Sequence, residues 1–213
     1  MKVAIFQFSL FGINTYLVYD PDSRECAVID PGMINEQEEK AISGFIAKHS
    51  LKLTNIINTH LHIDHVAGNR YLQLKYDAPV KAHLLDEPLG NRVSQQAMMF
   101  GMTENVPNVE ITEYLKAGDV IKIGDGELRV IPVPGHSQGS VALYDEKDKF
   151  VIVGDALFQG SIGRTDLPGG DYDQLITSIK GNLLTLPDDT TVFPGHGPST
   201  TIAAEKRHNP YLS

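Results

Sequence analysis

Residues 59–65 of this chain read Thr59-His60-Leu61-His62-Ile63-Asp64-His65, directly after an apolar run. Three imidazoles and a carboxylate in so short a stretch are difficult to place in a packed interior, because His and Asp are rarely buried unless they are paired or ligated. If the backbone is extended here, His60 and His62 point to the same side. A catalytic zinc ion commonly takes three protein ligands and keeps one position for water. The stretch therefore predicts that the chain binds metal.

Further candidate ligands follow downstream in Gly- or Pro-rich turns. They are His136 in Pro134-Gly135-His136-Ser137, Asp155 in Val153-Gly154-Asp155-Ala156, and His196 in Phe193-Pro194-Gly195-His196-Gly197. Each turn comes after an apolar, strand-like segment, and the ends of strands on a rigid sheet hold ligands well. We expect these turns to bring their side chains to the histidine cluster and to build a two-metal site with it.

The spacing divides the candidate ligands between two ions. Asp64 and His65 lie beyond the expected strand end, where the chain turns into a helix, so they can face a different ion from the one on His60. Asp155 can bridge both ions through its two oxygens. The expected first set is His60, His62 and His136, and the expected second set is Asp64, His65 and His196.

A pair of ions in this arrangement suits hydrolysis. Two ions roughly 3.5–4 Å apart can share a hydroxide near neutral pH, because metal binding lowers the pKa of water to about 7. That bridging hydroxide attacks an acyl carbon without a Ser or Cys nucleophile. Asp64 can orient the nucleophile and move its proton, which makes it the predicted catalytic residue. The expected cofactors are two divalent ions, with zinc the first choice, although imidazole and carboxylate also suit iron and manganese.

Composition limits the class of protein. The 213 residues, 41% of them hydrophobic, are sufficient for one large domain spanning 1–213. A net charge of −9 without a Lys/Arg cluster argues against a nucleic-acid partner. No apolar run is long enough to span a bilayer, and the N-terminus lacks a signal sequence, so we expect a cytoplasmic protein without a membrane partner.

The single cysteine, Cys26, lies among apolar residues and is expected to be a buried structural thiol. Oligomeric state is not predicted.

Hydropathy patterns predict a mixed α/β chain. Strands are expected at 15–19, 25–29, 53–58, 79–82, 120–123, 127–133, 141–144, 150–153 and 191–193, and helices at 36–48, 67–76 and 171–184. This mixture favours two sheets packed face to face with helices outside. The segment 84–115 is expected to be partly helical and without strand alternation. Its Met98, Met99, Phe100 and Met102 suit either a flexible apolar wall for a substrate or ordinary helix packing, which we favour.

The histidine cluster also resembles a known signature. His60-Leu61-His62-Ile63-Asp64-His65 is similar to the H-x-H-x-D-H motif of the metallo-β-lactamase superfamily, and the later candidate ligands occur in the order of its later motifs. The resemblance extends over essentially the whole chain, including Asp30-Pro31-Gly32. It implies a four-layer αββα sandwich, with two mixed β-sheets, helices on the outer faces, and metal ions at one edge.

Within that superfamily, the chain resembles the glyoxalase II (hydroxyacylglutathione hydrolase) branch. The similar segments are Gly154-Asp155-Ala156-Leu157-Phe158 and Gly163-Arg164-Thr165-Asp166, and the C-terminal segment resembles short bacterial members. The resemblance implies hydrolysis of the thioester S-D-lactoylglutathione to glutathione and D-lactate, or of a related small-molecule acyl-thiol.

This chain differs from longer glyoxalase II enzymes at two places that bear on which thiol carrier it accepts. The chain stops 17 residues after His196, so the C-terminal helical domain that binds glutathione in longer members is expected to be absent. Pro198 also stands where those members have a Tyr. Arg164 occupies the place of a Lys that contacts glutathione and is the predicted substrate-binding residue. Its guanidinium can hold a substrate carboxylate, or it can form a structural ion pair with Asp166 or Asp171.

One alternative belongs to a different reaction class. Persulfide dioxygenases share the general pattern, including a Gly-Arg-Thr-Asp segment, and are oxidoreductases with one iron. The residues equivalent to their ligands are His60, His136 and Asp155. Because this chain also offers a complete second set of ligands, we favour the dinuclear hydrolase. A β-lactamase, a flavodiiron-like component and an RNA-processing nuclease fit the sequence less well.

Overall fold

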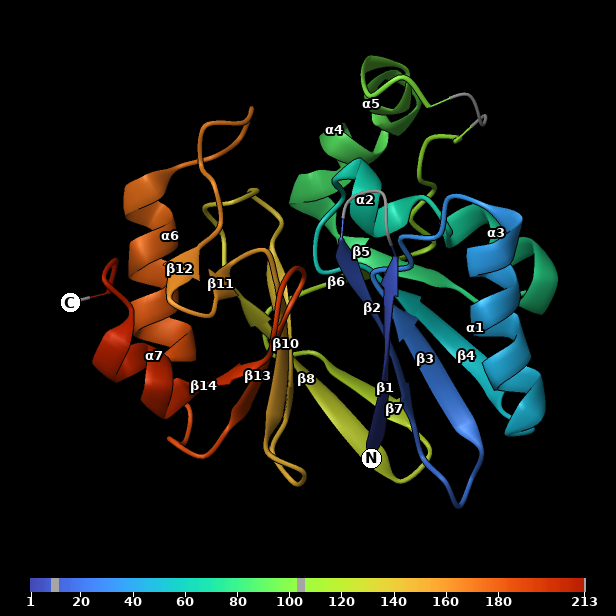
Figure 1. Cartoon of the computed structure of the whole chain (residues 1–213), viewed down its shortest axis with the longest axis horizontal. Helices are drawn as coiled ribbons and strands as arrows, with labels where there is room; N and C mark the ends of the chain where they lie inside the picture. Colours follow the sequence, from blue (N-terminus) through green and yellow to red (C-terminus); the bar gives the residue numbers. More distant parts are fainter. Residues whose placement is uncertain (9–11, 103–105, 213) are drawn as a thin grey trace.

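The computed structural model describes residues 1–8, 12–102 and 106–212. The first half of the chain forms a six-stranded sheet in which strand order follows the sequence (Figure 1). Its first three strands are antiparallel, and the remaining pairings are parallel. The strands are β1 (Lys2–Phe8), β2 (Ile13–Tyr19), β3 (Glu25–Ile29), β4 (Lys52–Ile57), β5 (Val80–His83) and β6 (Glu113–Leu115).

The second half forms another six-stranded sheet, in the order β14-β13-β10-β9-β8-β7. All its pairings are antiparallel except that of β10 with β13. Its strands are β7 (Val120–Ile123), β8 (Gly126–Pro132), β9 (Val141–Asp145), β10 (Phe150–Gly154), β13 (Thr191–Pro194) and β14 (Thr200–Thr201). A small hairpin of β11 (Leu157–Phe158) and β12 (Ser161–Ile162) follows β10.

Helices cover the outer faces of both sheets (Figure 1). Beside the first sheet lie α1 (Glu36–Lys48) and α3 (Asn69–Tyr76), and beside the second lie α6 (Tyr172–Ser178) and α7 (Ile202–His208). Short elements complete the set: α2 (Ile63–Val66), the 3₁₀ helix η1 (Leu84–Asp86), α4 (Glu87–Gly90), α5 (Val93–Met99) and the π-helical turn η2 (Ile179–Leu183). Among the described residues, no helix combines the length and apolar character needed to cross a bilayer.

Alternating side chains on the central strands build three apolar layers. In β10, Phe150 and Ile152 pack between the sheets, whereas Val151 and Val153 pack under the helices of the second half. In β3, Ala27 and Ile29 face the other sheet, while Cys26 and Val28 face the helices of the first half. Successive side chains of a strand point to opposite faces, so strands buried on both faces are apolar throughout. The predicted αββα sandwich is confirmed.

Several local predictions need correction. The predicted helix at 67–76 is found as α3, which begins two residues later, and the short helix α2 before it, inside the histidine cluster, was not predicted. The segment 84–115, whose residues 103–105 lie outside the described part, does contain a strand, β6. Helix packing was the wrong expectation for Met98, Met99 and Phe100, which are 70%, 79% and 62% exposed, whereas Met102 does pack against the core.

Candidate metal centre

The candidate ligands gather because strand ends of both sheets meet at one edge. His60 and His62 follow the end of β4, and α2 begins directly after His62. In the second sheet, His136, Asp155 and His196 follow β8, β10 and β13. These three strands run in the same direction, since β8 and β10 are each antiparallel to β9, and β13 is parallel to β10. The topology therefore carries all of these ligands to one edge.

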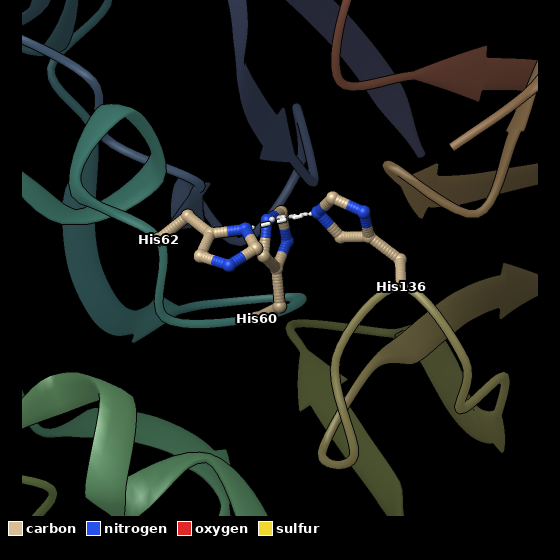
Figure 2. A group of neighbouring side chains, drawn as sticks. All are labelled: His60, His62 and His136. Carbon is tan, nitrogen blue, oxygen red and sulfur yellow. Dashed lines mark hydrogen bonds between the residues drawn. The ribbon is translucent and has the colours of Figure 1, made fainter. Parts of the chain in front are cut away.

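Three histidines form the first group, and their rings point toward one another (Figure 2). His136 Nε2 lies 2.9 Å from His62 Nδ1 and 3.3 Å from His60 Nε2. Nitrogen ligands bound to one tetrahedral zinc ion at about 2.0–2.1 Å would themselves be about 3.3 Å apart. The spacing of the ring nitrogens thus fits a single ion.

Asp64, His65 and His196 form the second group. Asp64 Oδ2 lies 3.2 Å from His196 Nε2 and 3.8 Å from His65 Nε2. Asp155 lies between the groups: its Oδ1 is 3.3 Å from His65 Nε2, and its Oδ2 is 3.6 Å from His196 Nε2 and 3.8 Å from His136 Nε2. The structure thus brings together all seven predicted ligands, in the two sets that the spacing indicates.

Two imidazoles of the first group, His60 and His62, are neutral at pH 7. Burial, with His65 and His136 nearby, holds the pKa of His60 well below its ordinary value. Burial, followed by the neighbouring His136, lowers the pKa of His62 to about 4. A hydrogen bond of 2.7 Å from His136 Nδ1 to the carbonyl oxygen of Arg164 leaves the lone pair of His136 on Nε2, inside the group. Neutral rings with inward lone pairs are what a cation requires.

The second group contains negative charge. Burial disfavours an ionised Asp64, but His65 and His196 outweigh it and hold the pKa of that carboxyl well below its ordinary value. Burial also disfavours charge on His196, yet the hydrogen bond to Asp64 and the charge of Asp155 raise its pKa. Carboxylates that stabilise positive charge on a neighbouring ring also attract a metal ion.

Unpaired polar atoms support the fit of a cation. Among the described residues, both ring nitrogens of His65 and Oδ1 of Asp155 are buried without a hydrogen-bond partner. Their close approaches do not have hydrogen-bond geometry. A buried polar atom without a partner costs free energy, and a metal ion between His65 Nε2 and Asp155 Oδ1 would remove that cost for these two atoms. The donor set therefore fits the divalent ions that the sequence predicts.

Asp30 supports this centre, although the sequence analysis assigned it no role. Its carboxylate accepts hydrogen bonds from the backbone N–H and the hydroxyl of Thr59, at 2.7 and 2.6 Å. The same carboxylate lies 3.0 Å from His65 Nδ1. Asp30 thus fixes the start of the histidine cluster and faces the outer nitrogen of a ligand ring. The Asp30-Pro31-Gly32 turn was the available sequence signal.

Gly195 makes room for the centre. A Cβ atom at this position would lie 2.2 Å from Asp155 Oδ1 and 2.7 Å from His65 Cε1. The backbone cannot easily retreat, because Gly195 N donates to Gly154 O at 2.8 Å and Asn14 N donates to Gly195 O at 2.7 Å. Only glycine fits this close approach.

The guanidinium of Arg164 is held by a neighbouring carboxylate. Its Nε and Nη2 donate to Asp166 at 2.7 and 2.8 Å, and both side chains are exposed. Of the two partners considered from sequence, Asp166 is therefore the one found, whereas Asp171 caps α6 by accepting from Gln174 N. Substrate binding by Arg164 stays a prediction.

Comparison with known proteins agrees with this geometry. Residues 9–196 match the sequence model of the metallo-β-lactamase superfamily. The chain belongs to the metallo-β-lactamase superfamily. Hydroxyacylglutathione hydrolase GloC of Haemophilus influenzae is 34% identical over 100% of this chain and 99% of its own length. The probable metallo-hydrolase YqgX of Bacillus subtilis is 38% identical over 94% of this chain and 92% of its own length.

Solved structures of the superfamily share the whole fold. TTHA1623, in a di-iron-bound form, is 37% identical, with a TM-score of 0.87 over 99% of this chain and 100% of its own. The BLEG-1 B3 metallo-beta-lactamase is 32% identical, with a TM-score of 0.88 over 100% of both chains. ETHE1 from Myxococcus xanthus is 31% identical, with a TM-score of 0.78 over 99% of this chain and 84% of its own. The chain therefore has the fold of a superfamily of metal-dependent hydrolases, and its His/Asp groups can bind metal ions.

Proposed function

We propose that this chain is a dinuclear metal-dependent thioester hydrolase of the glyoxalase II type, acting on S-D-lactoylglutathione or a related acyl-thiol. The observation that carries the proposal is the pair of complete ligand groups with Asp155 between them. The full-length similarity to hydroxyacylglutathione hydrolase GloC supports the substrate class. Zinc is the first choice of metal, and the di-iron form of TTHA1623 supports testing iron as well.

Substrate approaches from the side of the centre that solvent reaches. His60, His65 and His136 are at most 3% exposed, whereas the side chains of Asp64 and His196 are 19% and 27% exposed. An acyl carbon therefore comes close to Asp64 and His196 first. The ring of Phe158, 6.3 Å from that of His196, borders the same side.

When bound, the two ions lower the pKa of water to about 7 and polarise the thioester carbonyl. Asp64 provides the proton transfer, because its carboxylate is ionised and is the most exposed acidic group of the centre. It accepts the proton that the attacking water loses and delivers it to the thiolate sulfur as the carbon–sulfur bond breaks. His196 orients Asp64 through their 3.2 Å contact. Arg164, if it exchanges Asp166 for a substrate carboxylate, holds the thiol carrier.

The alternative is a persulfide dioxygenase-like oxidoreductase with one iron, which the similarity to ETHE1 favours. The two proposals differ in whether the second ligand group binds a metal ion. A mononuclear iron enzyme needs His60, His136 and Asp155 and leaves Asp64, His65 and His196 without a metal-binding role. The completeness of that second group is the reason we prefer the hydrolase.

Metal quantification of freshly purified protein, paired with a panel of small thioesters, tests the proposal. We expect two ions per chain and hydrolysis of at least one 2-hydroxyacyl thioester. Oxygen uptake with glutathione persulfide, together with one iron per chain and no thioester hydrolysis, would replace our proposal with the alternative.

A further inference from the structure

A buried carboxylate outside both ligand groups connects the segments that carry the first one. Asp86 ends η1 and is 1% exposed. Its Oδ2 accepts from Leu61 N at 3.1 Å and from the Ser137 hydroxyl at 2.8 Å. Its Oδ1 accepts from Gly139 N at 2.6 Å. Hydrogen bonds to a buried charged group are among the stronger ones in proteins, so Asp86 ties these three positions firmly together.

The donors belong to two ligand loops from different sheets. Leu61 stands between His60 and His62, after a strand of the first sheet, and Ser137 directly follows His136, after a strand of the second. The three histidines therefore converge only if these loops keep their relative position. A backbone hydrogen bond of 2.9 Å from Val141 N to Thr59 O joins the same two segments at a second point. Asp86 acts at the loop tips, where the ligand rings are attached.

The loop of the second sheet is shaped around this carboxylate. Because the Ser137 hydroxyl gives its proton to Asp86, the hydroxyl of Ser140 donates to Ser137 Oγ at 2.7 Å. Ser137 N in turn donates to Ser140 Oγ at 3.2 Å, which closes a tight turn. A Cβ on Gly139 would lie 2.7 Å from Cγ, Oδ1 and N of Asp86. The turn thus approaches Asp86 as closely as a backbone can.

We propose that Asp86 is a positioning residue for the first metal group, holding His60 and His62 at the distance from His136 that one ion requires. The inference rests on the proposed metal binding by these histidines, but not on the substrate or on the second group. No donor to Asp86 belongs to the second group among the described residues. Loss of the carboxylate should therefore weaken the binding of the ion in the first group and leave the binding of the other ion unchanged.

Asp86→Asn is the most selective change. The two oxygens of Asp86 face separate backbone N–H groups, of Leu61 and Gly139. Whichever oxygen becomes the amide nitrogen, an N–H then faces an N–H, and one of the two loops loses a backbone hydrogen bond to residue 86. Substitutions of groups that support metal ligands typically lower metal affinity about 10- to 100-fold, and we expect a loss in this range for one ion.

Glu205→Gln is a matched control. Glu205 is 2% exposed and likewise accepts three hydrogen bonds, from Gly160 N, the Thr200 hydroxyl and Asn209 Nδ2. It lies outside the first metal group. Its loss is expected to lower the melting temperature without changing the affinity of that group.

The experiment is a cobalt(II) titration of the metal-free full chain, followed by visible absorption, with circular dichroism and melting temperature of the same samples. The proposal is supported if one of the two cobalt-binding steps is 10- to 100-fold weaker in Asp86→Asn and its absorption band is altered. The circular dichroism of this variant should stay native, and Glu205→Gln should show no such change in binding. Unchanged affinities and bands in Asp86→Asn overturn it. Equal weakening of both steps with loss of native circular dichroism also overturns it, because Asp86 would then only support the fold.

Ser137→Ala keeps the test decisive if Asp86→Asn does not fold. It removes one of the three donors and leaves the carboxylate, so it should weaken the same step by a smaller factor, and no weakening would refute the proposal. Wild-type protein that binds a single ion would refute the dinuclear function. The role of Asp86 would still be supported if the affinity for that single ion is lower in Asp86→Asn.

Discussion

Replacing Gly195 with alanine tests how closely the centre is packed. The added Cβ would lie 2.2 Å from Asp155 Oδ1, a distance that must grow to at least 3.0 Å. Two backbone hydrogen bonds hold residue 195 in place, and the nearby ring of His65 is fully buried. The carboxylate must therefore move by about 1 Å, away from its position between the two groups. A misplacement of about 1 Å can cost roughly 100-fold in rate, which corresponds to about 2.7 kcal/mol of barrier.

The assay is kcat/KM for the best thioester of the panel, measured with metal content for wild type and Gly195→Ala. Gly44→Ala is the matched control, because a Cβ at this position in α1 meets nothing within 4 Å. The control should keep full activity and gain about 0.5–1 kcal/mol of stability, since glycine is unfavourable inside a helix. Gly195→Ala protein with two ions and kcat/KM within a factor of three of wild type would refute the reasoning.

Three further predictions concern the ions. His62→Ala should abolish hydrolysis while the circular dichroism stays native, because the ring is a predicted ligand of the first ion; near-normal turnover would contradict the site assignment. Removing metal with a chelator should lower the melting temperature, since buried His65 Nε2, which has no hydrogen-bond partner among the described residues, would lose the ion that it binds. An unchanged melting temperature would argue that no ion contacts this ring. Lowering the pH should release the ion at Asp64, His65 and His196 before the other. The pKa of His196 is raised, so protons displace metal from this ring at a higher pH. The pKa of His62 is lowered to about 4, so protons compete with metal there only in more acidic solution. Metal content measured after dialysis from pH 8 to pH 5 checks this order, and release of the three-histidine ion first would contradict it.

The sequence predicted the parts of this protein whose patterns are local. The helix at 36–48 has the predicted bounds, because an amphipathic stripe follows the N-cap Asn35. Strands buried on both faces are continuous apolar runs and were also found. The candidate ligands were predicted because imidazoles and carboxylates at strand ends have few structural uses.

What the sequence could not supply depends on contacts between distant segments. Asp86 receives hydrogen bonds from residues 25, 51 and 53 positions away in the chain, and two of its three donors are backbone N–H groups that leave no pattern in side chains. The strand β6 has three residues, too few for alternation to be recognised. The apolar side chains Met98 and Met99 resemble a buried stripe, but they lie near the end of a short helix that places them at the surface.

Anomalous diffraction from crystals of the metal-loaded protein tests the central claim most directly. The account predicts two peaks roughly 3.5–4 Å apart, one contacted by His60, His62 and His136 and the other by Asp64, His65 and His196, with Asp155 touching both. A single peak, or peaks away from these side chains, would contradict it.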